Sequence, residues 1–345
     1  MPNEPTSTTQ GRTKRMQATA RMASVVSSTL PARRRLIRDV GRFYRLPIMS
    51  ILRHAFAILV TTGLVGLCAA EPLHVPTVLM RSTFKLQGST GTKGGIGTGT
   101  VFMLGQPDAG NPKVNHLVLV TAAHVLEALR AETATLLLHT AKDDGFERLP
   151  ISIRIRDGET PRWTRHPDAD VAAMRVALPK NADLQLISTN LLATDELLQR
   201  HGIGPGEELI VLGFPHGAEA NPAGFPILRS GRIASYPLTP AAKTKTFLLD
   251  FQVFPGNSGG PVCLYAPNRG YDDQKRPTGL QAIVGLVSRE RNIDQRANNP
   301  DGKTQTTTRT PLKIGIIVHA HFIREVLDLL PSATKPNPES APTGQ

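Results

Sequence analysis

Residues 254–262 read FPGNSGGPV, which places Ser258 among glycines that can turn backbone N–H groups toward a developing oxyanion. Ser258 is therefore a candidate nucleophile. One glycine-rich serine turn is weak evidence by itself, but two further motifs precede it, TAAH at 121–124 and DADVA at 168–172. The three motifs present histidine, aspartate and serine in that order, the set that acyl-transfer chemistry through a serine requires.

Together the three motifs resemble the trypsin-like serine peptidases, and the form GNSGG resembles the HtrA-like bacterial branch of that family. The resemblance covers roughly residues 78–330. It implies an all-β fold of two six-stranded Greek-key barrels with a C-terminal helix. The implied function is that of a serine endopeptidase, a hydrolase that acts on polypeptide substrates and needs no cofactor and no metal.

The resemblance assigns a role to each motif residue. His124 is the expected general base, Asp170 the carboxylate that orients it and Ser258 the nucleophile, while the backbone N–H groups of Gly256 and Ser258 form the expected oxyanion hole. Asp168 competes with Asp170 for the acidic role. We favour Asp170, because it opens the apolar run over 171–176, whereas Asp168 lies beside a proline in an expected turn.

Substrate selection is predicted from position in the motif. Gln252, six residues before the serine, is expected at the base of the specificity pocket, and its neutral side chain favours small or aliphatic substrate residues over Lys or Arg. The strand over 282–288 is expected to pair with the substrate backbone through Val284, Gly285 and Leu286. Asn257 stands where digestive trypsins have an aspartate, so we predict activity without proteolytic activation.

The net charge of +12 is concentrated at the N-terminus, where residues 1–70 hold 11 Lys/Arg and 2 Asp/Glu. The remainder is nearly balanced, which argues against a nucleic-acid partner. An apolar run over 55–67 is followed by Cys68-Ala69-Ala70, which is typical of an export signal cleaved after Ala70. We therefore expect a periplasmic or secreted protein without stable membrane association, the alternative being an inner-membrane signal anchor. We also hypothesise that translation begins at Met49.

Short β-type runs separated by turn residues divide the rest of the chain. The expected protease domain covers 71–330, and its parts are a first barrel over about 78–178, a connector over 179–206 with a helical stretch at 194–201, a second barrel over about 207–318 and a helix over 320–330. Residues 331–345 are expected to be a disordered tail, which leaves no room for the PDZ domain of HtrA proteins.

Two long polar segments, 266–279 and 289–310, are predicted to be loops of the second barrel. They either border the substrate cleft or form solvated insertions. A further alternative concerns the whole domain, since the same fold can serve as a catalytically silent peptide-binding module. Of the two cysteines, Cys68 lies in the expected signal, so no disulfide is predicted, and Cys263 is expected to be a buried apolar side chain.

Overall fold

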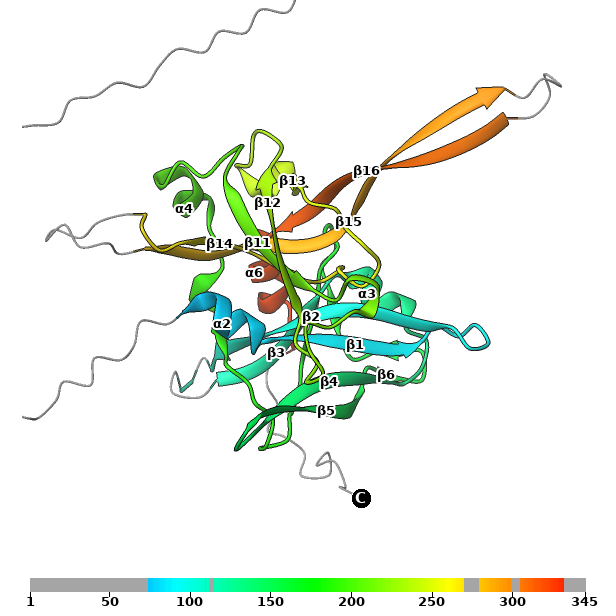
Figure 1. Ribbon diagram of the computed structural model, residues 1–345, viewed down its shortest axis with the longest axis vertical. Coiled ribbons are helices and arrows are strands. Elements are labelled where there is room, and N and C mark those ends of the chain that lie inside the picture. The colour runs from blue at the N-terminus through cyan, green and yellow to red at the C-terminus, as the bar shows by residue number, and fades with distance from the viewer. Residues whose placement is uncertain (1–73, 109, 112–114, 270–278, 299–304, 332–345) are drawn as a thin grey trace, which may run out of the picture. The chain divides into compact units, whose positions relative to one another are not determined.

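The computed structural model describes residues 74–108, 110–111, 115–269, 279–298 and 305–331 (Figure 1). The expected signal, the hypothesised start at Met49 and nearly all of the expected tail lie outside these ranges. Within them, no helix is long and apolar enough to cross a bilayer. The architecture is all-β, and two sheets carry almost all of the strands.

The first sheet occupies the region where the first barrel is expected. Its strands follow the order β5-β4-β1-β2-β3-β9-β8, and β10 pairs in parallel with β2. Their bounds are β1 Thr83–Ser89, β2 Ile96–Pro107, β3 Asn115–Thr121, β4 Thr133–Lys142, β5 Gly145–Arg154, β8 Thr164–Arg165, β9 Ala172–Arg175 and β10 Ile187–Ser188. The sheet thus has eight strands rather than the predicted six, because the chain adds the two-residue strands β8 and β10 at its margins.

Shorter elements surround this sheet. Strands β6 (Arg156–Asp157) and β7 (Thr160–Pro161) form a separate two-stranded sheet. Helix α2 (Val75–Met80) precedes β1, and helix α3 (Ala123–Ala128) follows β3 directly. Residues 101–104 of β2 are all fully buried, which is expected for a strand covered on both faces.

The region of the expected connector contains a short 3₁₀ helix, Thr189–Leu191, and helix α4, Asp195–Arg200. The Thr194 hydroxyl accepts a hydrogen bond from the Leu197 N–H at 3.2 Å and so caps α4. Asp195 and Glu196 lie in the first turn, where carboxylates interact favourably with the helix dipole. Local sequence therefore accounts for where this helix begins.

The second half is a closed barrel of six strands in the order β11-β12-β13-β16-β15-β14. The bounds are β11 Glu208–Gly213, β12 Ile227–Ile233, β13 Thr246–Asp250, β14 Pro261–Ala266, β15 Leu280–Asn298 and β16 Gln305–His319. A 3₁₀ helix, Pro215–Gly217, follows β11, and helix α5, Ala241–Thr244, precedes β13. Helix α6, Ala320–Asp328, closes this half, and it buries Phe322, Ile323 and Val326 as its apolar spacing predicts.

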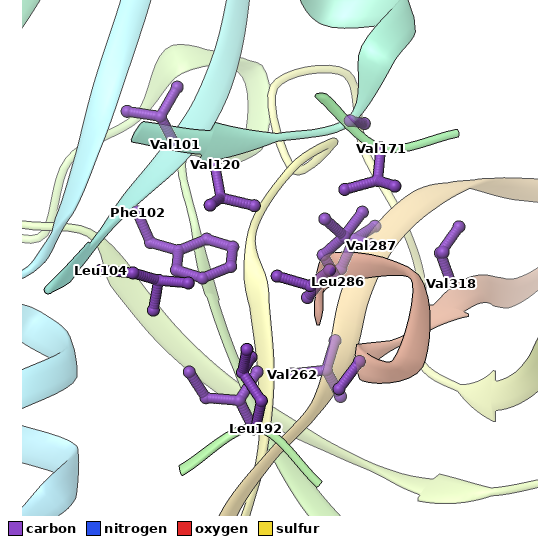
Figure 2. Close-up of a cluster of buried hydrophobic side chains, with 14 of the residues drawn as sticks. Val101, Phe102, Leu104, Val120, Val171, Leu192, Val262, Leu286, Val287 and Val318 are labelled. Carbon is purple, nitrogen blue, oxygen red and sulfur yellow. The ribbon is translucent and has the colours of Figure 1, made fainter. Parts of the chain in front are cut away.

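A single buried cluster joins the two halves (Figure 2). The first sheet contributes Phe102, Leu104 and Val120, and the barrel contributes Val262 and Leu286, among others. Cys263 belongs to this cluster, and burial raises the pKa of its thiol. Because both halves pack against the same side chains, residues that lie between the halves are held at fixed positions relative to one another.

The segment 289–310, predicted to be a loop, is instead largely strand. β15 and β16 continue past the barrel and pair with each other from Asn292–Pro311 to Asn298–Gln305. Figure 1 shows them leaving the barrel as a two-stranded ribbon. We call residues 289–298 and 305–313 the arm. Its polar, threonine-rich sequence lacks the apolar alternation of a half-buried strand, which is why the pattern suggested a loop.

Candidate active site

His124 and Asp170 are brought together by the pairing of β3 with β9, in which Thr121 lies opposite Ala172. His124 lies in the first turn of α3, just after β3, and Asp170 lies just before β9. The Asp170 carboxylate accepts the His124 backbone N–H at 3.0 Å and lies 2.8 Å from His124 Nδ1. This contact places the ring proton on Nδ1 and leaves Nε2 as a proton acceptor.

The environment of Asp170 keeps it ionised. A third contact comes from the Ser288 hydroxyl, which donates to Asp170 Oδ2 at 2.5 Å. Burial by itself raises the pKa of the Asp170 carboxyl, but the hydrogen bond and charge of His124 and the hydroxyl of Ser288 outweigh burial and lower the pKa to about 2. Asp170 is therefore a carboxylate throughout the neutral pH range.

Asp168, the competing carboxylate, is exposed and lies in a separate turn. The ring of buried His166 holds that turn, because its Nδ1 accepts the backbone N–H groups of Asp168 and Ala169, each at 3.1 Å. No described residue links Asp168 to His124. The geometry therefore gives the acidic position to Asp170.

Ser258 lies in the turn between β13 and β14. Thr100 of β2, in the first sheet, binds backbone carbonyl groups of this turn. The Thr100 N–H donates to the Ser258 carbonyl at 2.9 Å, and the Thr100 hydroxyl donates to the Gly256 carbonyl at 2.6 Å. Gly256 has a φ of 94°, and a Cβ there would lie 2.2 Å from the Phe214 carbonyl oxygen. Only glycine fits this position.

Asn257 closes the turn from within. It is 1 % exposed, its side-chain Oδ1 accepts the Phe254 N–H at 2.9 Å, and its own N–H donates to the Phe254 carbonyl at 3.0 Å. The amide thus makes its contacts inside the turn and requires no charged partner from elsewhere in the chain.

The Ser258 hydroxyl donates to the Ser288 carbonyl at 2.9 Å. Ser288 therefore contacts Ser258 through its backbone and Asp170 through its side chain. Among the hydrogen bonds of the described residues, none joins Ser258 directly to His124. The sequence motifs did not reveal Ser288, because a serine at the end of an apolar strand carries no distinguishing spacing.

The N–H groups of Gly256 and Ser258, the expected oxyanion donors, have no acceptor among the described residues. The neighbouring Pro255 carbonyl is occupied, since it accepts the His216 N–H at 2.6 Å. Most N–H groups in folded proteins are paired, so two unpaired donors beside a serine mark a place where a ligand oxygen can bind.

Comparison with known families agrees with this geometry. Residues 97–266 match the family described as the trypsin-like peptidase domain. The chain contains a trypsin-like peptidase domain. A search of curated proteins found no match for the chain. The matched range includes Thr100, His124, Asp170 and Ser258, while Ser288 and the arm lie beyond it.

A hollow of about 400 Å³ opens at the His124 side of the trypsin-like domain. Its lining includes His124, Asp170 and Arg289, together with Glu127 and Arg165, which form an ion pair at 2.8 Å. The hollow is large enough for part of a polypeptide chain. No group of three potential metal ligands occurs among the described residues.

The predicted substrate-pairing edge at Val284, Gly285 and Leu286 requires correction. All three residues are buried. Gly285 and Leu286 pair with β14 on one side and with β16 on the other, so their backbone groups are already used. On the β14 side, pairing of β15 ends at Leu286. A free edge therefore begins farther along the strand, near Ser288.

Gln252 is half-buried, and its surroundings contain a cation that the motif did not reveal. The Arg229 guanidinium donates to the Gln252 carbonyl at 2.9 Å and lies over the Phe251 ring at 4.3 Å and the Phe254 ring at 5.4 Å. Arg229 comes from β12, 23 residues earlier, where no sequence signal connects it with the serine turn.

Proposed function

We propose that the domain is a serine endopeptidase that uses His124, Asp170 and Ser258 on polypeptide substrates. The observation that carries the proposal is the continuous chain of hydrogen bonds from His124 through Asp170 and Ser288 to Ser258. It connects a base, an ionised carboxylate and a hydroxyl across the two halves of the domain.

In the proposed reaction, Ser258 Oγ attacks the substrate carbonyl carbon while His124 Nε2 takes the hydroxyl proton. Asp170 stabilises the imidazolium that results. The carbonyl oxygen becomes negative and receives the free N–H groups of Gly256 and Ser258. The C–N bond then breaks as His124 returns the proton to the leaving amine, and water hydrolyses the Ser258 ester with His124 again acting as base.

The resting contact of Ser258 suggests how substrate binding prepares the serine for reaction. Its hydroxyl donates to the Ser288 carbonyl, so it must rotate before His124 can take the proton. A substrate backbone N–H that binds the Ser288 carbonyl would replace the hydroxyl and release it for attack. Asn257 satisfies the turn internally, which supports activity without proteolytic activation.

Specificity follows from the groups at Gln252. The Arg229 guanidinium beside the Gln252 carbonyl would repel a Lys or Arg side chain, which supports a preference for small or aliphatic residues. Export through the N-terminal signal, with a periplasmic or secreted location, is part of the same proposal, and the mass of the mature N-terminus tests it. The relation to the HtrA-like branch stays a prediction.

The second candidate function is a silent peptide-binding module, favoured by the Ser258 hydroxyl pointing to Ser288 rather than to His124. A fluorophosphonate probe separates the two functions. We expect the wild-type chain to be labelled, and Ser258→Ala to lose labelling while its thermal unfolding stays unchanged. A folded wild-type chain that resists the probe and leaves denatured proteins uncut would favour the binding module.

A further inference from the structure

β15 has an open backbone edge that begins at the candidate active site. The strand pairs with β14 only as far as Leu286, whereas its pairing with β16 continues to Asn298. Among the described residues, nothing pairs with residues 289–298 on the edge opposite β16. These residues extend for roughly 30 Å at the usual rise of a β-strand.

The open edge is continuous with the groups that would contact substrate. Val287 still pairs toward the serine turn, since its N–H donates to the Gly260 carbonyl at 2.9 Å. The next residue, Ser288, presents its carbonyl to Ser258, and Arg289 lines the hollow beside His124. A polypeptide bound at Ser258 can therefore continue along β15 without crossing another element.

The two edges of the arm differ in their capacity to accept a strand. The β16 edge contains Pro311, which has no N–H, and a bulge where the partner of β15 shifts from Gly315 to Pro311. Lys313, inside that bulge, has a φ of 59°. Such interruptions protect edge strands from pairing. β15 has one register shift of its own, between Val287 and Arg289, at the start of the edge. From Asn292 to Asn298 its register with β16 is regular, and residues 289–298 contain neither proline nor glycine, so the β15 edge stays open.

The charge of the arm indicates what would bind there. Its basic residues are Arg289, Arg291, Arg296, Arg309 and Lys313, against the acidic Glu290 and Asp294. Arg309 pairs with Asp294 at 3.0 Å, whereas the guanidinium groups of Arg289 and Arg291 are exposed and contact no described acidic group. A second arm would repel this one, and an acidic segment would be attracted.

An isolated two-stranded ribbon is only marginally stable in water, and a third strand stabilises it. We propose that the β15 edge over residues 289–298 binds an extended acidic segment of the polypeptide substrate, which adds as a third strand to the arm. This inference rests on the proposed peptidase function for the identity of its ligand. The free guanidinium groups of Arg289 and Arg291 select acidic side chains, and the backbone edge provides sequence-independent pairing.

The test measures binding to the full chain carrying Ser258→Ala, so that no cleavage occurs. The probe is a fluorescent peptide of about ten residues, roughly the length of the open edge, with Glu alternating with Thr. We expect Arg289→Glu/Arg291→Glu to raise its Kd about tenfold, since two attractive charges become repulsive. Arg232→Glu on β12 is the control and should leave the Kd unchanged, because Arg232 is an exposed arginine on a strand that pairs with neither β15 nor β16.

Backbone pairing is tested separately with two versions of the peptide that are N-methylated at alternate residues, in opposite phases. In an antiparallel pair only every second residue directs its N–H to the neighbouring strand, so one version should lose binding and the other should retain it. The basic residues 1–70 are identical in all variants and cannot produce this difference.

Equal affinity for the two methylated peptides, or an unchanged Kd in Arg289→Glu/Arg291→Glu, overturns the inference. A peptide with Lys in place of Glu that binds as tightly also overturns it. These outcomes are independent of catalysis. A wild-type chain that fails to label while its Ser258→Ala form binds the acidic peptide would refute the peptidase function and leave the proposed binding edge in place. A wild-type chain that labels while its Ser258→Ala form does not bind the peptide would support the peptidase function and refute the binding edge.

Discussion

The first sheet and the second barrel contribute to the site in different ways. From the first sheet come two ionisable side chains, His124 and Asp170, placed at the ends of two paired strands. The barrel provides a turn whose function resides in backbone groups, around Gly256 and Ser258. Substitution of Asp170 would therefore remove the partner of His124 directly. The turn, in contrast, is perturbed by changing the residues that hold its backbone, such as Thr100.

The largest expected effect concerns Asp170→Asn. An amide cannot stabilise the imidazolium and can hold the wrong tautomer, so kcat should fall about 10⁴-fold with little change in KM. Steady-state kinetics on a peptide substrate measure the change. Asp168→Asn is the matched control, because that carboxylate is exposed and lies two residues away, and its kcat should match wild type. Equal losses in the two variants would contradict the assignment of Asp170.

A smaller effect is expected at Thr100, where the two halves meet. Thr100→Val removes the hydroxyl that donates to the Gly256 carbonyl and accepts the Phe214 N–H at 3.3 Å. We expect kcat to fall between about tenfold and a hundredfold, because the oxyanion donors lose their alignment, while KM changes little. Thr100→Ser retains the hydroxyl and should restore most of the rate.

A structural explanation of that loss is tested with Ser82→Ala. This variant also removes a buried hydroxyl, which donates to the Val78 carbonyl at 2.6 Å in the turn between α2 and β1. Both variants should cost about 1–3 kcal/mol of unfolding free energy. If Ser82→Ala lowered kcat as much as Thr100→Val, reduced stability rather than positioning would account for the effect.

The smallest expected effect contrasts two histidines, one from each half. The His124 side chain is 45 % exposed beside a carboxylate, whereas His319 is 1 % exposed at the start of α6. Burial lowers the pKa of His319 to about 4. The unfolded chain binds this proton near pH 6.5 and the folded chain does not, so acidification through that interval favours unfolding.

Between about pH 7 and pH 5.5, His319 should therefore reduce the unfolding free energy by about 1 kcal/mol. Urea titrations at the two pH values measure this, and His319→Gln should flatten the dependence. His201→Gln, at the partly exposed end of α4, should leave the slope as in wild type. An unchanged slope in His319→Gln would mean that His319 is protonated in the folded state.

The arm and the edge residues show where sequence patterns mislead. The sequence predicts that Val284, Gly285 and Leu286 contact substrate because they belong to the strand beside the serine turn. In the structure Gly285 and Leu286 already pair with neighbours on both sides, and Val284 is buried. The charges of residues 289–298 hide any alternation, so the sequence predicts a loop there. In both cases the deciding fact is which neighbour pairs with each stretch of β15, and one chain's pattern of residues does not contain it.

The sequence by itself determined which residues are candidates for the site: the order of His124, Asp170 and Ser258, the glycine required at 256, and the amphipathic helix that closes the second half. These depend on residue types at fixed local spacing, which any reader of the chain can recognise. Only the tertiary structure decided that Ser288 links serine to aspartate, that Thr100 holds the turn and that Arg229 lies at Gln252. Such contacts join residues far apart in the chain, and packing rather than spacing brings them together.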